Sequence, residues 1–384
     1  MAVSPLLCTA EQLSELARWF AEQLDVPQID ILETRKLSGG AIQQNWLITL
    51  STEQDAQKQT HSEPPHSVHS HYVLPRYVLP RYVLRCDAPS QLGVSHPKSA
   101  EAALLSAAAE MGVLVPQIIG ICADETLIGK PFFVMSYIPG EAQARKWVRH
   151  PQKAEFAAHL AVQLGQQMAA LHQITPDNPH LAFLSRPDTS AEEQALAEIR
   201  GILDKMDMPH PVLEFACHWL KERMQDWQDG SEIVLCHRDF RTGNFLIHDG
   251  QITALLDWEF ARFSVPAEDI GWLCARCWRF GADQLAVGGL ADYRDFRAGY
   301  LAAGGTPPAL RTIRYWQIFA ELRWAAIALE QAWRCQVAGE LSLELVLSAP
   351  LVAEMEYHLL TLISEMDTLS HDAQQVIFEQ RGLI

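Results

Sequence analysis

The sequence predicts an α+β protein with a strand-rich first part and a mostly helical second part. Short apolar runs separated by turn residues dominate the chain up to Ile138. After the turn residues Pro139 and Gly140, long stretches carry apolar residues at helical spacing. A chain of 384 residues, 48% of them hydrophobic, can bury enough core for two lobes. We therefore expect one lobe over residues 1–138 and a second over residues 139–384.

The composition limits the classes of partner. The formal net charge of −17 disfavours nucleic acid and anionic membranes, because both are bound through clusters of Lys and Arg. No apolar run approaches the roughly 20 residues that a membrane span needs. Eight irregularly spaced cysteines, with no signal peptide before them, indicate reduced thiols in a cytoplasmic protein. Cys274 and Cys277 form a Cys-x-x-Cys, but no second pair accompanies it, so we expect both to pack in the core.

The chain begins with a helix and a glycine-containing turn. Residues 9–24 start at Thr9, a good N-cap, and carry apolar residues at helical spacing. Residues 37–50 read as two strands joined through Gly39 and Gly40. Glycine lets a backbone approach an anion closely, so the amides from Ser38 onward could bind phosphate, although an ordinary turn is the alternative.

A polar insertion with a short repeat, residues 51–81, separates this turn from the next strand. Two copies of Tyr-Val-Leu-Pro-Arg precede a third copy, Tyr-Val-Leu-Arg, that lacks the proline. Because proline cannot donate to a strand ladder, only residues 82–85 should form a buried strand. A helix over residues 100–111 and strands over residues 114–120 and 131–137 complete the first lobe.

Residues 233–260 form the stretch around which the second lobe is organised. Apolar runs flank Asp249 and Gly250, the strongest short signal for a β-hairpin. Asp239 and Asn244 therefore lie on a loop held between strands, and Asp257 follows the last strand. One carboxylate could orient a hydroxyl group, while an Asn and an Asp supply the oxygen ligands that suit magnesium.

The remainder of the second lobe reads as helices. Residues 154–172 end at His172, which we expect to pack or to cap the helix end. Residues 310–337 and 341–369 are predicted as two long helices. Tryptophans at helical spacing on the first usually belong to a core.

The stretch from His237 to Glu259 resembles the catalytic loop and metal-binding strand of the protein kinase-like phosphotransferases. Asp257 is followed by Trp-Glu rather than Phe-Gly, which resembles the aminoglycoside phosphotransferase and choline kinase branch. Within that branch, the sequence is most similar to bacterial phosphotransferases related to the kinase-like domains fused to some acyl-CoA dehydrogenases. The resemblance covers about residues 35–300 and implies a bilobal protein kinase-like fold, with a small antiparallel sheet in the N-lobe and a mostly helical C-lobe.

This resemblance implies roles for individual residues. Asp239 would be the catalytic base, and Asn244 and Asp257 would hold Mg2+. An Asp in residues 266–272 would bind the backbone of the catalytic loop, while Glu259 could reach the metal, face solvent or brace the loop. Among the nucleotide-binding residues, Ser38, Gly39 and Gly40 would cover the phosphates. Arg85 would take the place of the usual strand lysine, with Glu101 as its partner. The carbonyl of Ser136 and the amide of Ile138 would bind adenine.

The implied reaction transfers the terminal phosphoryl group of ATP, bound between the lobes with Mg2+, to a hydroxyl group of a small molecule. Hydroxylated acyl compounds are one acceptor class, and antibiotics or amino alcohols are another. The sequence leaves the oligomeric state open. The alternative function is a nucleotide-binding pseudokinase that acts as a regulatory scaffold, and the departure at Arg85 from the lysine pattern keeps it open.

Overall fold

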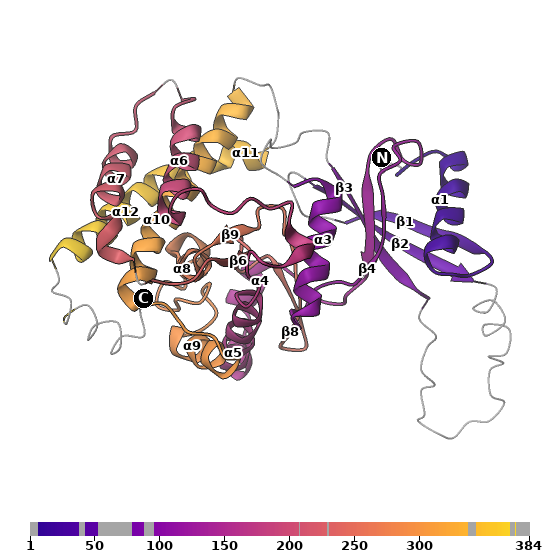
Figure 1. Ribbon diagram of the computed structural model, residues 1–384, viewed down its shortest axis with the longest axis horizontal. Coiled ribbons are helices and arrows are strands. Elements are labelled where there is room, and N and C mark those ends of the chain that lie inside the picture. The colour runs from indigo at the N-terminus through magenta and orange to yellow at the C-terminus, as the bar shows by residue number, and fades with distance from the viewer. Residues whose placement is uncertain are drawn as a thin grey trace. The chain divides into compact units, whose positions relative to one another are not determined.

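The computed structural model describes residues 7–37, 43–52, 79–87, 96–206, 208–228, 230–336, 343–368 and 373. The chain divides into two compact units (Figure 1). Unit 1 comprises Met1–Ser106 and Pro116–Ile138, and unit 2 comprises Ala107–Val115 and Pro139–Ile384.

Unit 1 is built on a five-stranded sheet in which all neighbouring strands are antiparallel. The predicted small antiparallel sheet is therefore confirmed. Its strands, in their order across the sheet, are β1 (Ile29–Lys36), β2 (Gln43–Thr52), β3 (Arg81–Asp87), β5 (Phe132–Ser136) and β4 (Ile118–Cys122).

In the described part of the chain, helices α1 (Ala10–Gln23) and α3 (Lys98–Glu110) accompany this sheet. The Thr9 side chain accepts a hydrogen bond from the amide of Gln12 and completes a capping box, so the predicted N-terminus of α1 is confirmed. Helix α1 lies beside β1 and β2 (Figure 1). Leu16 and Phe20 are both fully buried and join the apolar core of the sheet.

The strand predictions for unit 1 need two corrections. The first strand of the predicted pair lies earlier than residue 37, because β1 ends at Lys36. It escaped notice because β1 is an edge strand whose exposed side chains are largely charged, so it carries no clear apolar alternation. The strand expected from residue 114 begins only at Ile118, after Pro116.

The proline-free copy of the repeat forms the interior strand β3, as predicted, with residues 83–86 buried. Ser38, Gly39 and Gly40 lie outside the described residues, as does most of the polar insertion.

Unit 2 is mostly helical, with two small two-stranded sheets. The sheets pair β6 (Val234–Cys236) with β9 (Arg262–Ser264) and β7 (Phe245–His248) with β8 (Gln251–Leu255). The helices are α4 (Ala144–Val148), α5 (Lys153–Leu171), α6 (Ala191–Leu203), α7 (Pro211–Glu222), α8 (Pro266–Cys274), α9 (Tyr293–Ala302), α10 (Leu310–Gln336), α11 (Leu343–Ser348) and α12 (Leu351–Thr368), with three short 3₁₀ helices η1 (Pro179–Leu181), η2 (Met224–Trp227) and η3 (Arg276–Trp278).

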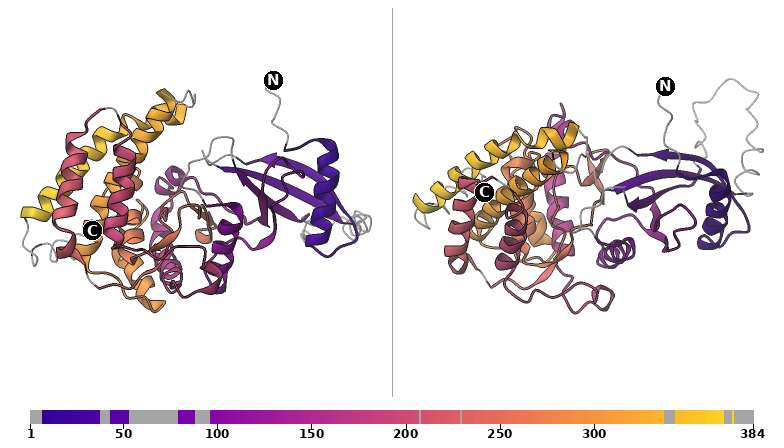
Figure 2. Two further views of the ribbon diagram at one scale, coloured as in Figure 1. Left: turned by 45° about the horizontal axis from the view of Figure 1, so that its top comes forward. Right: turned by 90° about the horizontal axis from the view of Figure 1, so that it is seen from above.

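Helices α7, α10 and α12 lie side by side in both views of Figure 2, where α12 is yellow and α10 orange. They share one apolar core, to which Trp219, Trp316 and Leu359 contribute. The prediction that a tryptophan stripe belongs to the core is confirmed for Trp316, whereas Trp324 is only partly buried.

The last predicted helix is divided in two. Helix α11 ends at Ser348 and α12 begins at Leu351. Pro350 explains the break, because proline lacks an amide donor and disfavours helical geometry at the preceding residue.

The expectation that no segment is long and apolar enough to span a membrane also needs correction. Val346–Thr368 meets that test by length and by its mean hydropathy of 1.3. One face of α12, including Met355 and Ile363, nevertheless packs in the core shared with α7 and α10. This packing accounts for the apolar composition of that face.

The hairpin between β7 and β8 follows the prediction closely. Asp249 and Gly250 form its tip with φ angles of 48° and 73°. Two consecutive left-handed residues are the geometry of the type I′ turn, which favours Asp-Gly because its twist matches that of the strands.

Replacing Gly250 should therefore destabilise unit 2. In Gly250→Ala the backbone keeps a left-handed φ, and the added Cβ lies 3.2 Å from Cβ of Phe156. We expect a loss of about 1–2 kcal/mol in the free energy of unfolding, measured by urea denaturation.

Gly201 provides the matched control. It lies within α6, and an added Cβ there meets no atom within 4 Å. Gly201→Ala should stabilise the protein by about 0.5–1 kcal/mol. Equal effects of the two substitutions would contradict this explanation of the turn.

Candidate active site

The loop between β6 and β7, residues 237–244, is fixed by a buried carboxylate from α8. The amide of His237 donates to Oδ2 of Asp269 at 2.7 Å, and the amide of Arg238 donates to Oδ1 at 2.6 Å. Asp269 has no exposed surface, so these charge-assisted bonds are made away from water. The prediction that an Asp of this segment binds the loop backbone is confirmed.

His172 supports this carboxylate from the end of α5. Its Nε2 lies 3.3 Å from Oδ2 of Asp269, and its Nδ1 lies 2.7 Å from the hydroxyl of Tyr300. The interpretation of His172 as a packed residue at a helix end is therefore confirmed.

A possible metal site is formed by His172, Cys236 and Asp269, whose ligand atoms lie close together. The state of these side chains argues against metal binding. Both carboxylate oxygens of Asp269 already accept loop amides. Burial, reinforced by Asp269, raises the pKa of the Cys236 thiol well above its ordinary value. A protonated thiol is a poor metal ligand, so we assign this cluster to support of the loop.

Arg238 holds the loop through an ion network that is buried except at Glu198. Its φ of 63° is left-handed, which an arginine adopts only under constraint. Its Nε donates to Glu268 at 2.8 Å and its Nη2 to Glu198 at 2.5 Å. Arg262 pairs with both of these carboxylates, which closes the network.

The charges of this network stabilise one another. Burial opposes the charge of Glu268, yet Arg238 and Arg262 hold its pKa well below the ordinary value. Burial likewise opposes the charge of Arg238, while Glu268 and Glu198 raise its pKa. The buried charges of Glu268 and Arg238 are thus each compensated by partners of opposite sign.

Asp239 lies in the middle of this fixed loop. Its Oδ1 accepts from the indole Nε1 of Trp272 and from Nε of Arg241, both at 3.0 Å. Its Oδ2 accepts from Nδ2 of Asn244 at 2.5 Å. The predicted base Asp239 and the predicted metal ligand Asn244 are thus in direct contact.

His237 links Asp239 to the end of β8. Its Nε2 lies 2.9 Å from the carbonyl oxygen of Leu256, which can only accept, so Nε2 carries the proton. Nδ1 is then the acceptor for the amide of Asp239, at 3.2 Å. The neutral ring joins the loop to the residue that precedes Asp257.

Asn244 and Asp257 lie at the open end of the β7–β8 hairpin. The amide of Leu256 donates to the carbonyl of Asn244 at 2.7 Å and extends the ladder past Phe245 and Leu255. Asp257 follows immediately, with a left-handed φ of 62°. The hairpin therefore brings together two residues that are 13 positions apart in the chain.

The donor set suits magnesium. Both hydrogen bonds from the Asn244 side chain to Asp239 use Nδ2, which leaves its oxygen Oδ1 as the atom that can coordinate a cation. The carboxylate of Asp257 is a second hard oxygen donor in sequence position next to Leu256. Magnesium prefers such ligands to nitrogen or sulfur. Glu259 is buried, so the solvent-facing alternative for it is wrong.

Unit 1 contains a second buried ion network. Nε of Arg85 lies 2.5 Å from Oε1 of Glu101, and Nζ of Lys98 lies 2.8 Å from Oε2 of the same carboxylate. Lys98 also lies 3.2 Å from Asp87. The structure thus pairs Arg85 with Glu101 and adds Lys98, which sequence reasoning missed although it precedes Glu101 by one helical turn.

Ser136 and Ile138 lie at the end of unit 1. The side chain of Ser136 accepts from the amide of Gln117 at 2.9 Å, so its hydroxyl is engaged within the sheet. Pairing with β3 continues only to Tyr137, whose amide donates to the carbonyl of Arg81. Ile138 is therefore the first residue beyond the sheet.

Comparison with known proteins identifies the family. The model of the phosphotransferase enzyme family matches residues 33–316, well over half of the chain. The chain belongs to this family. Acyl-CoA dehydrogenase family member 10 of Mus musculus is 23% identical over 261 residues, which cover 65% of this chain and 24% of that protein. The chain thus spans about a quarter of the length of such relatives.

Solved structures of phosphotransferases share the fold. A putative aminoglycoside phosphotransferase from Ralstonia eutropha JMP134 matches with a TM-score of 0.68 and 18% identity, covering 93% of this chain and 98% of that one. A spectinomycin phosphotransferase, solved with ADP and spectinomycin, matches with a TM-score of 0.58 and 11% identity, covering 92% and 98%. The predicted protein kinase-like fold and the recognised family are therefore confirmed.

Sequence reasoning found the loop but missed most of the residues that support it. Glu198, Glu268 and Arg323 contact the loop or its partners, and Trp272 contacts Asp239 itself. The available signal was the presence of charged residues within apolar helical runs, because a buried charge requires a partner.

The ion network predicts how stability depends on pH. Because the pKa of Glu268 is depressed in the folded state, its ionised form stabilises the protein above the ordinary pKa of 4.5, and this contribution is lost as the pH falls below that value. Glu268→Gln removes the titrating group. We expect the free energy of unfolding to fall less steeply from about pH 6 to about pH 3 in Glu268→Gln than in the wild type.

Denaturation at each pH measures this slope, and Glu214→Gln is the control because Glu214 makes an exposed pair with Arg200. At neutral pH, Glu268→Gln should itself lose about 3–5 kcal/mol, because it leaves buried arginines without their full partners. Identical pH slopes for Glu268→Gln and the wild type would refute the role assigned to Glu268.

Proposed function

We propose that this phosphotransferase moves the terminal phosphoryl group of ATP to a hydroxyl group of a small molecule, with Mg2+ as cofactor. The observation that carries the proposal is the contact between Asp239 and Asn244 at the hairpin end where Asp257 follows Leu256. One carboxylate is thereby set beside two oxygen ligands for a cation. The family membership agrees with this reaction class.

Asp239 is the residue that orients the acceptor hydroxyl and takes its proton. Trp272, Arg241 and Asn244 fix its carboxylate, so little reorganisation is needed when the acceptor binds. Asn244 and Asp257 would hold Mg2+ through their side-chain oxygens. When bound, the cation neutralises charge on the phosphate oxygens.

The nucleotide would be held by the residues that the resemblance in sequence predicts. Arg85, kept in place by Glu101, would bind phosphate oxygens in the role usually taken by a lysine. Ser38, Gly39 and Gly40 would cover the phosphates with their amides, and the carbonyl of Ser136 and the amide of Ile138 would bind adenine. ADP in the related spectinomycin enzyme supports ATP as the nucleotide.

For the acceptor, we favour a hydroxylated acyl compound over an antibiotic or an amino alcohol. The likeness in sequence to acyl-CoA dehydrogenase family member 10 supports this choice. The antibiotic enzymes are similar in structure at 11–18% identity, and that likeness concerns the fold. We also infer a cytoplasmic location, in which the eight free cysteines remain reduced. The pseudokinase alternative is not favoured, because Asp239, Asn244 and Asp257 are all present.

Asp239→Asn tests the catalytic role. The amide keeps the shape of the side chain but cannot accept a proton, so we expect unchanged ATP affinity and a turnover reduced by about 10²- to 10⁴-fold. ATP consumption over a panel of hydroxylated acyl compounds, amino alcohols and aminoglycosides measures the turnover.

Asp249→Asn is the matched control, because Asp249 lies exposed at the hairpin tip and Asn also tolerates its left-handed φ. It should retain wild-type turnover. If Asp239→Asn turns over at the wild-type rate, Asp239 is not the base. Nucleotide binding by the wild type without turnover on any acceptor would favour the scaffold.

Asp257→Asn tests the metal ligand. Asn accepts the left-handed backbone at this position but removes the negative charge that attracts the cation. The increase in melting temperature caused by ATP with Mg2+ should largely disappear, while any increase caused by ATP with EDTA should not change. Retention of the full magnesium-dependent increase would rule out Asp257 as a ligand.

A further inference from the structure

The hydrogen bonds of Asp239 occupy its two oxygens unequally. A carboxylate oxygen has two lone pairs in the carboxylate plane. Both lone pairs of Oδ1 are used, one by Trp272 and one by Arg241. Oδ2 accepts from Asn244, which leaves it with one further direction. An acceptor hydroxyl that meets Asp239 in this arrangement would do so at Oδ2.

Of the three donors, Trp272 is the one best able to fix the carboxylate plane. Arg241 belongs to the same loop as Asp239, and a quarter of its side chain is exposed. Asn244 is the proposed metal ligand and also belongs to that loop. Trp272 comes from α8, 33 residues away, and is almost fully buried. Its indole therefore fixes the position of the carboxylate relative to helix α8, outside the loop.

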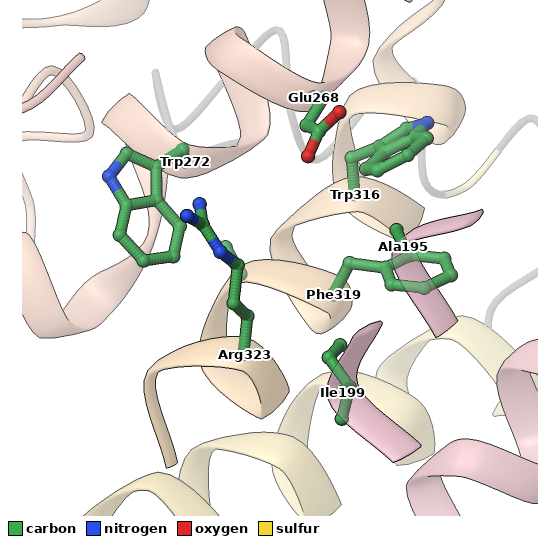
Figure 3. A pocket seen from close by; sticks show the side chains of 8 residues that line it. Ala195, Ile199, Glu268, Trp272, Trp316, Phe319 and Arg323 are labelled. Carbon is green, nitrogen blue, oxygen red and sulfur yellow. The ribbon is translucent and has the colours of Figure 1, made fainter. Parts of the chain in front are cut away.

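Helix α10 holds the indole in place. The guanidinium carbon of Arg323 lies 4.5 Å from the centre of the Trp272 ring, a cation–π contact. Nη1 of Arg323 also donates to the carbonyl of Arg238 at 2.6 Å. Figure 3 shows Arg323 reaching from α10 toward Trp272, with Glu268 and Trp316 across a small cavity.

Close packing of α8 on α10 leaves the indole little freedom. A Cβ added to Gly271 would lie 2.7 Å from Cβ of Trp316, so this glycine allows the two helices to approach. Burial lowers the pKa of Arg323 to about 10, and the side chain stays charged at neutral pH. Trp278 also packs against the indole, with ring centres 5.2 Å apart.

We propose that Trp272 is a positioning residue for Asp239: its indole N–H orients the carboxylate so that Oδ2 faces the acceptor hydroxyl. The inference rests on the proposed function. On this proposal, the side chain of Trp272, outside the catalytic loop and the metal site, affects the rate of the chemical step and does not affect nucleotide binding.

Trp272→Phe removes the N–H and keeps an aromatic ring. Trp316→Phe is the matched control, because Trp316 lines the same cavity, is equally buried and makes no hydrogen bond through Nε1 within the described residues. The probe is hydrolysis of ATP with Mg2+, in which water is the acceptor. We expect kcat of Trp272→Phe to fall about 10- to 100-fold with KM for ATP unchanged, and both kinetic constants of Trp316→Phe to stay near those of the wild type.

An indole resonance gives a readout that needs no turnover. In protein labelled with ¹⁵N-tryptophan, the Trp272 signal is the one missing from Trp272→Phe. Asp239→Asn weakens a charge-assisted hydrogen bond, so this N–H resonance should move upfield while that of Trp316 stays in place. If Trp272→Phe does not fold, the Trp272 signal is assigned by triple-resonance NMR of the wild type, and the comparison then needs only folded wild type and Asp239→Asn.

The outcomes separate the two proposals. Wild-type kcat in Trp272→Phe, or an indole resonance that Asp239→Asn does not move, overturns the positioning role and leaves the proposed function intact. A joint loss of kcat, ATP affinity and melting temperature in Trp272→Phe, absent from Trp316→Phe, shows a structural role and also overturns it. Absence of ATP turnover in wild type, with either water or the acceptor panel, overturns the proposed function itself.

Discussion

One buried carboxylate, Asp269, holds the loop on which the site depends. It accepts the amides of His237 and Arg238, the two residues that precede Asp239. These amides would otherwise be buried without partners, at a cost of about 1–3 kcal/mol each. Because Asp269 belongs to a helix packed closely on α10, the loop takes its position from the core of unit 2.

The ion network around Arg238 adds precision to this arrangement more than it adds stability. Moving the charges of Arg238, Arg262 and Glu268 out of water costs about as much as the attraction within the network returns. The network fixes the orientation of the Arg238 guanidinium group, because this group donates hydrogen bonds to Glu198 and to Glu268 at the same time. The left-handed backbone at Arg238 is tolerated under that constraint. Such rigid support is what a catalytic carboxylate requires.

Sequence alone predicted the features that depend on neighbouring residues. The hairpin at Asp249 and Gly250 and the capping of α1 by Thr9 are set by a few adjacent positions. The contacts of Trp272 with Asp239 and of Glu198 with Arg238 join residues 33 and 40 positions apart, so no local pattern encodes them. Pro350 could have predicted the break between α11 and α12. The apolar periodicity continues across this proline, and for that reason a single helix was predicted. Strand β1 lacked a signal because its position at the sheet edge allows charged side chains.

In the proposed site, Asn244 and Asp257 would hold one magnesium ion, and Asp239 would lie beside the terminal phosphate of ATP. A crystal structure of the protein with a non-hydrolysable ATP analogue and Mg2+ tests this arrangement most directly. The account predicts a cation about 2.0–2.1 Å from Oδ1 of Asn244 and from a carboxylate oxygen of Asp257, with phosphate oxygens completing its shell. A nucleotide bound with its cation on other side chains, or bound away from Asp239, would contradict it.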